Sequence, residues 1–452
     1  MKLWEYIKDE MLKYPEQVIC EGTAEITYEE MIIYAEVFAK KLKGEKCCAI
    51  VCVNEMASAI ALLSCFVAGV TAVPLSIRYG SSSCNKILEL IKPSAAIVDM
   101  NGELEVIYLE DKEYVIPDQH PALIMCTSGT TGRPKGVMLS ENNIISNVND
   151  ISEYFKISHH DSILISRPLY HCAVLTGEFL TALRKGIRIC FYSDAFNPQK
   201  LLTLIKKLNI TVFCGTPTML TMMSRYKRKN SEISLKAICI SGECLSDECG
   251  LKIADSFPEA DIYHVYGLTE ACPRVSYLPP DQFRKHPSSV GIPLKSVEIK
   301  IIPEGNSEGL LWIKGGNIMM GYYNDPELTK KTMCDDWLCT GDIAEMDDNY
   351  LKIKGRLDGL IIRAGMNIYP AEIENAVKVD PRVKEVVVYG MNQKDLTMQI
   401  CMKIAGDFKD VGEVRQMCAL RLPSHQMPSC IELVKELPKN GSGKIIRGCS
   451  NV

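Results

Sequence analysis

One short stretch of this chain, residues 127–136, constrains its fold more than any other feature. It reads Thr-Ser-Gly-Thr-Thr-Gly-Arg-Pro-Lys-Gly, and apolar runs precede it at 122–126 and follow it at 137–139. Short aliphatic runs bounded by turn residues are typical of buried strands. Glycines let a backbone approach a ligand closely, and neighbouring N–H and hydroxyl groups can surround phosphate oxygens. The stretch therefore predicts a phosphate-binding loop between two strands.

Two other interpretations of this loop fit less well. A Walker loop needs Gly-Lys followed by Ser or Thr at the start of a helix, whereas here Pro134 precedes Lys135 and Gly136 follows it. An ordinary polar hairpin needs a turn of only about two to five residues and no cluster of hydroxyls. The predicted nucleotide contacts in the loop are Thr127, Ser128, Gly129, Thr130, Thr131, Gly132 and Lys135.

Composition excludes several classes of protein. The 452 residues exceed one ordinary core, and the net charge of −5 without a long basic tract argues against nucleic acid as a partner. The 20 cysteines lie mostly in apolar runs and form no Cys-x-x-Cys pair, so we expect no zinc site and a reducing, cytoplasmic setting. The longest apolar stretch, 57–70, is too short to span a membrane, and acidic residues come too early for a signal peptide.

Apolar strands alternate with helices in two successive series up to about residue 265, which predicts parallel, doubly wound sheets. One of the expected helices covers 174–185, whereas the polar stretch 100–120 carries no predicted element. From 290 to 355, short strands separated by glycine turns predict an antiparallel β subdomain. The expected fold class is α/β. A large domain, 1–356, holds two doubly wound sheets and the β subdomain, and a small mobile α+β domain covers 357–452.

Four further motifs follow the loop in chain order. They read Tyr-Gly-Leu-Thr-Glu at 266–270, Thr-Gly-Asp at 340–342, Gly-Arg-Leu-Asp at 355–358 and Pro-Lys-Asn-Gly-Ser-Gly-Lys at 438–444. Taken singly, such motifs are more often caps, turns or solvated loops. Together with the loop they resemble the adenylate-forming superfamily, which includes acyl- and aryl-CoA synthetases, stand-alone adenylation enzymes and luciferases. The resemblance runs from about residue 25 to 447.

The resemblance implies roles for four residues of the first motif. Tyr266 would offer a face for adenine, and Gly267 would also contact the nucleotide. Thr269 and Glu270 would be catalytic, with Thr269 donating to the α-phosphate and Glu270 holding Mg²⁺. Magnesium is well suited to this arrangement, because it prefers one or two carboxylates plus phosphate oxygens. The motif also follows the strand expected at 261–264, and ligands of α/β sheets bind at strand ends.

The same resemblance places the remaining nucleotide contacts. Asp342 would accept both ribose hydroxyls, and Arg356 would contact the ribose side of the nucleotide. Gly242 and Glu243 resemble the segment that borders the adenine pocket, although this match is looser.

The C-terminal motifs imply a moving domain. Asp358 corresponds to the hinge, and Gly365 would let a thin pantetheine arm pass close to the backbone. Lys444 corresponds to the catalytic lysine. A cation that reaches both the carboxylate and the α-phosphate would stabilise a transition state in which two anions meet.

The substrate is constrained by the segment after the strand expected at 162–166. It contains no acid before Glu178, so a free α-amino acid is disfavoured as a substrate. Tyr170-His171 resembles acyl- and aryl-CoA ligases, in which this histidine borders the acyl pocket, although a lone histidine is more often structural. We therefore include His171 in the catalytic site and expect a small aryl or a short- to medium-chain acid.

These features predict a two-step ligase that uses ATP, Mg²⁺ and coenzyme A. The acid would become an acyl-adenylate with release of pyrophosphate, and a thiol would then displace AMP. A stand-alone enzyme that loads a phosphopantetheinyl acyl carrier protein would carry the same motifs and remains an alternative. Nothing favours a luciferase-like oxygenase, and a non-enzymatic binding protein would lack residues such as Glu270 and Asp342. A monomer or a homodimer fits equally.

Overall fold

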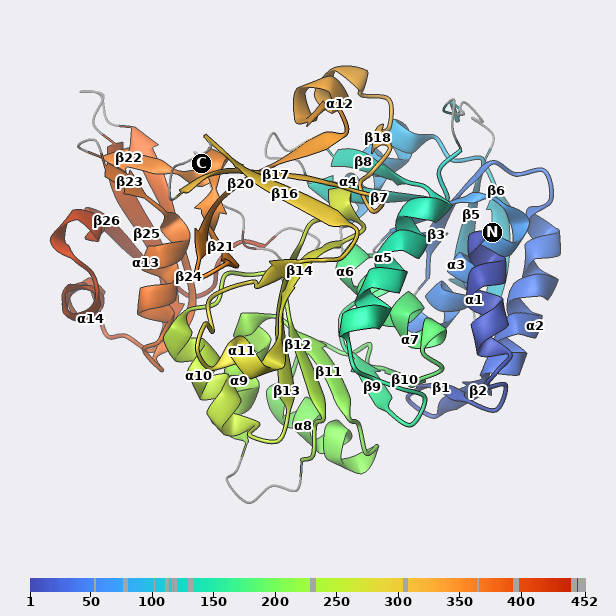
Figure 1. Cartoon of the computed structure of the whole chain (residues 1–452), viewed down its shortest axis with the longest axis horizontal. Helices are drawn as coiled ribbons and strands as arrows, with labels where there is room; N and C mark the ends of the chain where they lie inside the picture. The colour runs from blue at the N-terminus through green and yellow to red at the C-terminus, as the bar shows by residue number, and fades with distance from the viewer. Residues whose placement is uncertain are drawn as a thin grey trace.

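Figure 1 shows a computed structural model of the chain, with a broad N-terminal part and a smaller C-terminal part at one side. The structure describes all residues except 53, 76–79, 101, 110–113, 116, 118–119, 129–133, 228–232, 304–307, 364–365, 393–397, 440–444 and 446–452. It describes only the backbone of residues 80–83, 128, 362, 363, 366 and 392.

The phosphate loop predicted from the sequence belongs to a seven-stranded sheet. Its strands are β3 (Cys47–Val51), β4 (Thr71–Pro74), β5 (Ala95–Met100), β6 (Glu103–Tyr108), β7 (Leu123–Ser128), β8 (Pro134–Leu139) and β18 (Gly321–Tyr322). Their order is β18-β8-β7-β4-β3-β5-β6, and β5, β3, β4 and β7 are parallel. Helix α3 (Glu55–Ala68) connects β3 to β4, and α4 (Gly80–Ile91) connects β4 to β5. The first predicted doubly wound series is confirmed.

A second, nine-stranded sheet follows the order β15-β14-β13-β12-β11-β9-β10-β1-β2. Its strands are β1 (Val18–Glu21), β2 (Ala24–Thr27), β9 (Ser162–Ile165), β10 (Arg188–Phe191), β11 (Val212–Gly215), β12 (Ala237–Ile240), β13 (Asp261–Gly267), β14 (Arg274–Leu278) and β15 (Ile292–Pro293). The six strands from β13 to β1 are parallel, and the outer ones are antiparallel. Helices α8 (Pro198–Lys207), α9 (Pro217–Tyr226) and α10 (Asp247–Ser256) connect successive parallel strands.

Antiparallel strands form the β subdomain, as the sequence predicts. They are β16 (Val297–Ile302), β17 (Glu308–Gly315), β19 (Met333–Cys334), β20 (Trp337–Asp347) and β21 (Tyr350–Arg356). Helix α12 (Pro326–Thr332) precedes β19. In the nine-stranded sheet, the short helix η4 (Thr269–Ala271) connects β13 to β14, and α11 (Pro280–Phe283) lies between β14 and β15.

The C-terminal part is a separate α+β unit. It contains the strands β22 (Ile361–Arg363), β23 (Met366–Ile368), β24 (Val383–Asn392), β25 (Met398–Gly406) and β26 (Cys430–Val434), and the helices η5 (Leu357–Gly359), α13 (Pro370–Lys378), α14 (Val411–Arg421) and η6 (Ser424–Gln426). Its buried apolar residues form a cluster of their own. One ion pair to the β subdomain joins Lys354 Nζ to Glu372 Oε1 at 3.0 Å.

One hydrophobic cluster connects the two large sheets. It includes residues of β3, β9 and the intervening helix α5 (Glu141–Tyr154), together with α1 (Leu3–Met11) and α2 (Tyr28–Ala39). A local capping box fixes the start of α2: the side chain of Thr27 accepts a hydrogen bond from the backbone N–H of Glu30. None of the helices in the described part of the chain has an apolar run long enough to cross a bilayer.

The structure differs from the sequence prediction at several elements. Strands β15 and β18 lie within the span 290–355 predicted as the β subdomain, but they join the nine-stranded and the seven-stranded sheet. The polar stretch 100–120 contains strand β6, an edge strand whose side chains alternate between half-buried and exposed. The helix predicted over 174–185 is divided into α6 (Cys172–Val174), a π-helix at Leu175–Leu180 (labelled η3) and α7 (Thr181–Arg184). In a π-helix one extra residue is accommodated per turn, which changes the side chains that point inward.

Candidate active site

The phosphate loop is flanked by strands as predicted. Strands β7 and β8 pair antiparallel, with Thr127 opposite Lys135 and Ser128 opposite Pro134. Lys135 Nζ lies 5.4 Å from the ring centroid of Tyr322, a cation–π contact. The central predicted contacts, Gly129, Thr130, Thr131 and Gly132, and the side chain of Ser128 lie outside the described residues.

The Tyr322 hydroxyl extends this contact to Glu270. It donates a hydrogen bond of 2.9 Å to Glu270 Oε1. Glu270 belongs to η4, which begins at Thr269 directly after β13, and Tyr322 lies on β18, which pairs with β8 of the loop. Burial and the neighbouring Glu270 carboxylate raise the pKa of Tyr322, so it remains a donor. The predicted metal ligand is thus adjacent to the predicted phosphate loop.

A second carboxylate, Asp342, is held between two of the other predicted nucleotide contacts. The Tyr266 hydroxyl donates to Asp342 Oδ2, and Arg356 Nη1 lies 3.4 Å from Asp342 Oδ1. Arg356 Nη1 also donates to the carbonyl of Thr340 at 3.0 Å. Burial raises the pKa of Asp342, and Arg356 opposes this effect. Three motifs separated by up to 90 positions in the sequence therefore meet at one carboxylate.

Glycines in these motifs allow the close contacts. Gly341 has φ of +73°, and a Cβ there would lie 3.0 Å from Arg356 Nη2. A Cβ on Gly267 would lie 2.2 Å from the backbone oxygen of Pro273. A side chain on Gly341 would crowd Arg356 beside the carboxylate, and one on Gly267 would collide with the backbone of Pro273.

Two further predicted contacts, Glu243 and His171, lie at the starts of helices or beside them. Glu243 Oε2 accepts a 2.6 Å hydrogen bond from Thr218 Oγ1 at the start of α9, and Gly242 precedes it with φ of +93°. His171 is half-buried at the start of α6, and its ring centroid lies 4.4 Å from that of Tyr170.

The predicted hinge, Asp358, and the segment of the predicted catalytic lysine belong to the C-terminal part of the chain. Asp358 lies in η5 and is half-exposed, with Oδ1 at 3.6 Å from Arg356 Nε. Lys439 and Ile445 form an antiparallel bridge that flanks the segment 440–444. Lys444 and Gly365 themselves lie outside the described residues.

The donor set fits magnesium bound together with phosphate. Among the described residues, no group of three or more His, Cys, Asp or Glu side chains is placed to hold a metal ion. Magnesium rarely needs such a cage, since one carboxylate plus phosphate oxygens and water completes its octahedral shell. Glu270, adjacent to the strand that carries Lys135, supplies such a carboxylate.

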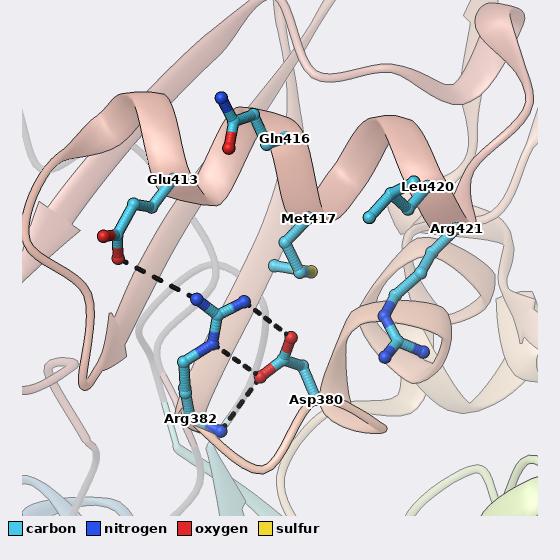
Figure 2. Close-up of a pocket in the computed structure, with 7 residues that line it drawn as sticks. All are labelled: Asp380, Arg382, Glu413, Gln416, Met417, Leu420 and Arg421. Carbon is cyan, nitrogen blue, oxygen red and sulfur yellow. Dashed lines mark hydrogen bonds and ion pairs between the residues drawn. The ribbon is translucent and has the colours of Figure 1, made fainter.

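A surface hollow of about 480 Å³ lies elsewhere, on the C-terminal unit. Figure 2 shows Arg382 between Asp380 and Glu413, with Nη2 at 2.9 Å from Asp380 Oδ2 and Nη1 at 3.8 Å from Glu413 Oε2. None of the motif residues lines this hollow, and its two carboxylates, Asp380 and Glu413, are both paired with Arg382. We therefore do not assign the reaction to it.

Two groups of site residues were missed in the sequence. Tyr322 belongs to no recognisable motif, and only its contacts reveal it. Arg167 donates to Glu178 Oε1 at 2.5 Å and lies 3.4 Å from Ser241 Oγ at the carboxyl edge of the nine-stranded sheet. The signal available in the sequence was a charged residue directly after an apolar strand.

Comparison with known proteins agrees with this geometry. Residues 7–323 match the AMP-binding enzyme family, and residues 372–444 match the AMP-binding enzyme C-terminal domain. The chain is 29% identical to a feruloyl-CoA synthase of Amycolatopsis sp. over 429 residues, which cover 87% of this chain and 86% of the relative.

The o-succinylbenzoate CoA synthetase of Bacillus subtilis is a structural relative at 25% identity. Its complex with the acyl-adenylate intermediate has a TM-score of 0.86, covering 98% of this chain and 96% of that one. Its complex with ATP and magnesium has a TM-score of 0.85, with 98% of each chain covered. A double mutant of it bound to a product analogue, OSB-NCoA, has a TM-score of 0.70, with 98% of this chain and 97% of that one covered. The chain described here belongs to the AMP-binding enzyme family.

Proposed function

We propose that this chain is an AMP-forming ligase that joins a small carboxylic acid to the thiol of coenzyme A at the expense of ATP. The observation that supports the proposal most strongly is the buried carboxylate of Asp342, which is contacted by both Tyr266 and Arg356. Beside the phosphate loop, Lys135, Tyr322 and Glu270 form a second contact series. A nucleotide needs both: a carboxylate for its ribose, and cationic and metal-binding groups for its phosphates.

In the first step, a carboxylate oxygen attacks the α-phosphate, the bond to the β-phosphate breaks, and pyrophosphate leaves. We assign the β- and γ-phosphates to the loop at 127–136 and the ribose to Asp342. Thr269 lies next to Glu270 at the start of η4, where a hydroxyl can donate to the α-phosphate. Magnesium bound by Glu270 would neutralise part of the phosphate charge.

In the second step, the thiol attacks the acyl carbon, and AMP leaves as the thioester forms. We assign Lys444 to the first step and Gly365 to the passage of pantetheine in the second, with Asp358 as the hinge between them. The C-terminal residues 357–452 would form the moving domain and residues 1–356 the fixed one. The higher TM-score with the acyl-adenylate complex than with the product-analogue complex supports assigning the described arrangement to the first step.

The test is pyrophosphate release across a panel of aryl, short-chain and medium-chain acids, with ATP and Mg²⁺ and the full chain. Release with some acids, followed by thioester formation with coenzyme A, is expected. A phosphopantetheinylated acyl carrier protein serves as the alternative acceptor, and a thioester formed only with it would overturn the choice of coenzyme A. No release with any acid would overturn the ligase assignment itself.

A further inference from the structure

Three charged side chains lie close together in the interior beside the carboxyl edge of the nine-stranded sheet. Arg167 follows β9, Glu178 lies on the π-helix, and Arg274 begins β14. Glu178 has a side chain that is 1% exposed, and Arg167 one that is 15% exposed. Arg274 is also buried, with Nη2 at 3.8 Å from Cys239 Sγ, and a Cβ on Gly177 of the π-helix would lie 3.1 Å from the same nitrogen.

The charges of this group do not cancel. Two guanidinium groups face one carboxylate: burial raises the pKa of Glu178, and the charges of its partner Arg167 and of the more distant Arg274 oppose this rise. Among the described residues, Nε of Arg167, Nε of Arg274 and Oε2 of Glu178 have no hydrogen-bond partner. A buried cation without a counter-charge and a buried donor without an acceptor are both unfavourable. The two unpaired guanidinium N–H groups therefore give the group capacity for an added anion, whereas the free Glu178 oxygen can only accept from a donor.

The position of Arg167 is suited to a substrate contact. It lies beyond the carboxyl end of β9, and Ser241, to which it is hydrogen-bonded, lies directly beyond the carboxyl end of β12. Ligands of open α/β sheets bind at this edge. The π-helix that carries Glu178 follows the segment of His171, where the sequence places the acyl pocket. Single π turns recur at functional sites, where the extra residue redirects a side chain.

We infer that Arg167, held by Glu178 and Ser241 and supported by the charge of Arg274, binds a second carboxylate on the acid substrate. The preferred substrate class is then a dicarboxylic acid, of which one carboxylate is activated and the other pairs with Arg167. A guanidinium group suits this role because its fork of donors matches the two oxygens of a carboxylate. The inference rests on the proposed function and narrows its substrate.

The first test uses the wild-type chain and matched acids that differ only at the far end. Pyrophosphate release is measured for butanoate, succinate and 4-hydroxybutanoate, and for hexanoate, adipate and 6-hydroxyhexanoate. We expect kcat/KM for at least one dicarboxylate to exceed that of its methyl-ended partner by about tenfold or more. Activity with methyl- or hydroxyl-ended acids but without this preference overturns the inference and leaves the ligase assignment intact. Inactivity with these acids overturns the inference, and inactivity that extends to the aryl acids of the panel above overturns the ligase assignment as well.

The second test assigns the preference to a residue. Arg167→Gln removes the charge and keeps a donor, and we expect the ratio of kcat/KM between dicarboxylate and matched monocarboxylate to fall at least about tenfold. Arg188→Gln is the matched control, because Arg188 is an arginine on neighbouring β10 whose Nη1 donates to the carbonyl of Leu208. Arg167→Lys is expected to retain part of the ratio. An unchanged ratio in Arg167→Gln would overturn the assignment to Arg167.

Discussion

At the scale of single residues, Asp342 is the carboxylate to which we assign the ribose of the nucleotide. It is buried, and both of its oxygens are engaged, one by the Tyr266 hydroxyl and one by Arg356. An amide of the same shape would keep the volume and lose the negative charge. The negative charge therefore orients the two neighbours, and in the proposed function the same carboxylate accepts the ribose hydroxyls.

Asp342→Asn is expected to raise the KM for ATP by roughly 10- to 100-fold. The substitution weakens the hydrogen bonds from the ribose hydroxyls, because hydrogen bonds to a charged group are stronger than those to a neutral amide. Pyrophosphate exchange at varied ATP concentration measures it. Asp347→Asn is the control, since Asp347 is an exposed carboxylate on the same strand β20. An unchanged KM in a folded Asp342→Asn protein would remove Asp342 from the ribose site.

Lys444→Ala is expected to abolish adenylate formation while thioester formation from supplied acyl-adenylate largely survives. The reason is that the cation is needed only where two anions meet, in the first step. Pyrophosphate release and thioester production are measured separately, with Lys435→Ala as an exposed control. Equal loss in both half-reactions would contradict a role confined to adenylation.

At the scale of the elements, strand β13 carries both Tyr266 of the candidate active site and a buried histidine that makes the stability of the fold depend on pH. His264 is buried on this strand, and its Nδ1–H donates to the carbonyl of Pro287 at 3.1 Å. Burial lowers the pKa of His264 to about 4 from its ordinary 6.5. Between these values the unfolded chain binds a proton that the folded chain does not, so stability rises with pH in this window and falls on acidification.

The expected loss is about 2 kcal/mol of the free energy of unfolding from pH 7.5 to pH 5, attributable to His264. Urea denaturation at both pH values measures it. His264→Phe is expected to be less stable at neutral pH and to lack this part of the pH dependence. The same pH dependence in wild type and variant would show that His264 does not carry it.

The elements also show what could be predicted from the sequence. Most strands of both parallel series, most of the β subdomain and the capping role of Thr27 follow from apolar runs and local side-chain chemistry. Strand β6 was missed because its exposed glutamates, Glu103 and Glu105, make an edge strand resemble a polar connection. The π-helix was missed because the pattern of apolar residues does not reveal one inserted residue. Tyr322 and the pairing of Arg167 with Glu178 depend on contacts across the chain, which no local pattern encodes.

At the scale of the whole molecule, the proposed reaction needs two arrangements of the C-terminal domain. Asp358→Pro is expected to spare pyrophosphate release and to reduce thioester formation at least about tenfold, because proline restricts φ at the hinge. Both half-reactions are measured on the full chain, and Asp358→Ala is the control that removes the carboxylate and leaves the backbone free. Unaffected thioester formation would place the hinge elsewhere.

The pairing of β18 with β8 has a consequence for how this protein can be recombined. Strand β18, which carries Tyr322, is the edge strand of the seven-stranded sheet and pairs with β8. In the sequence, however, β18 comes after all strands of the nine-stranded sheet and after β16 and β17 of the β subdomain. The last strands of that subdomain, β19 to β21, then follow. A crossover point anywhere between the end of β8 and residue 356 therefore separates strands that pair with each other. A chimaera intended to exchange substrate preference should inherit this whole region from one parent.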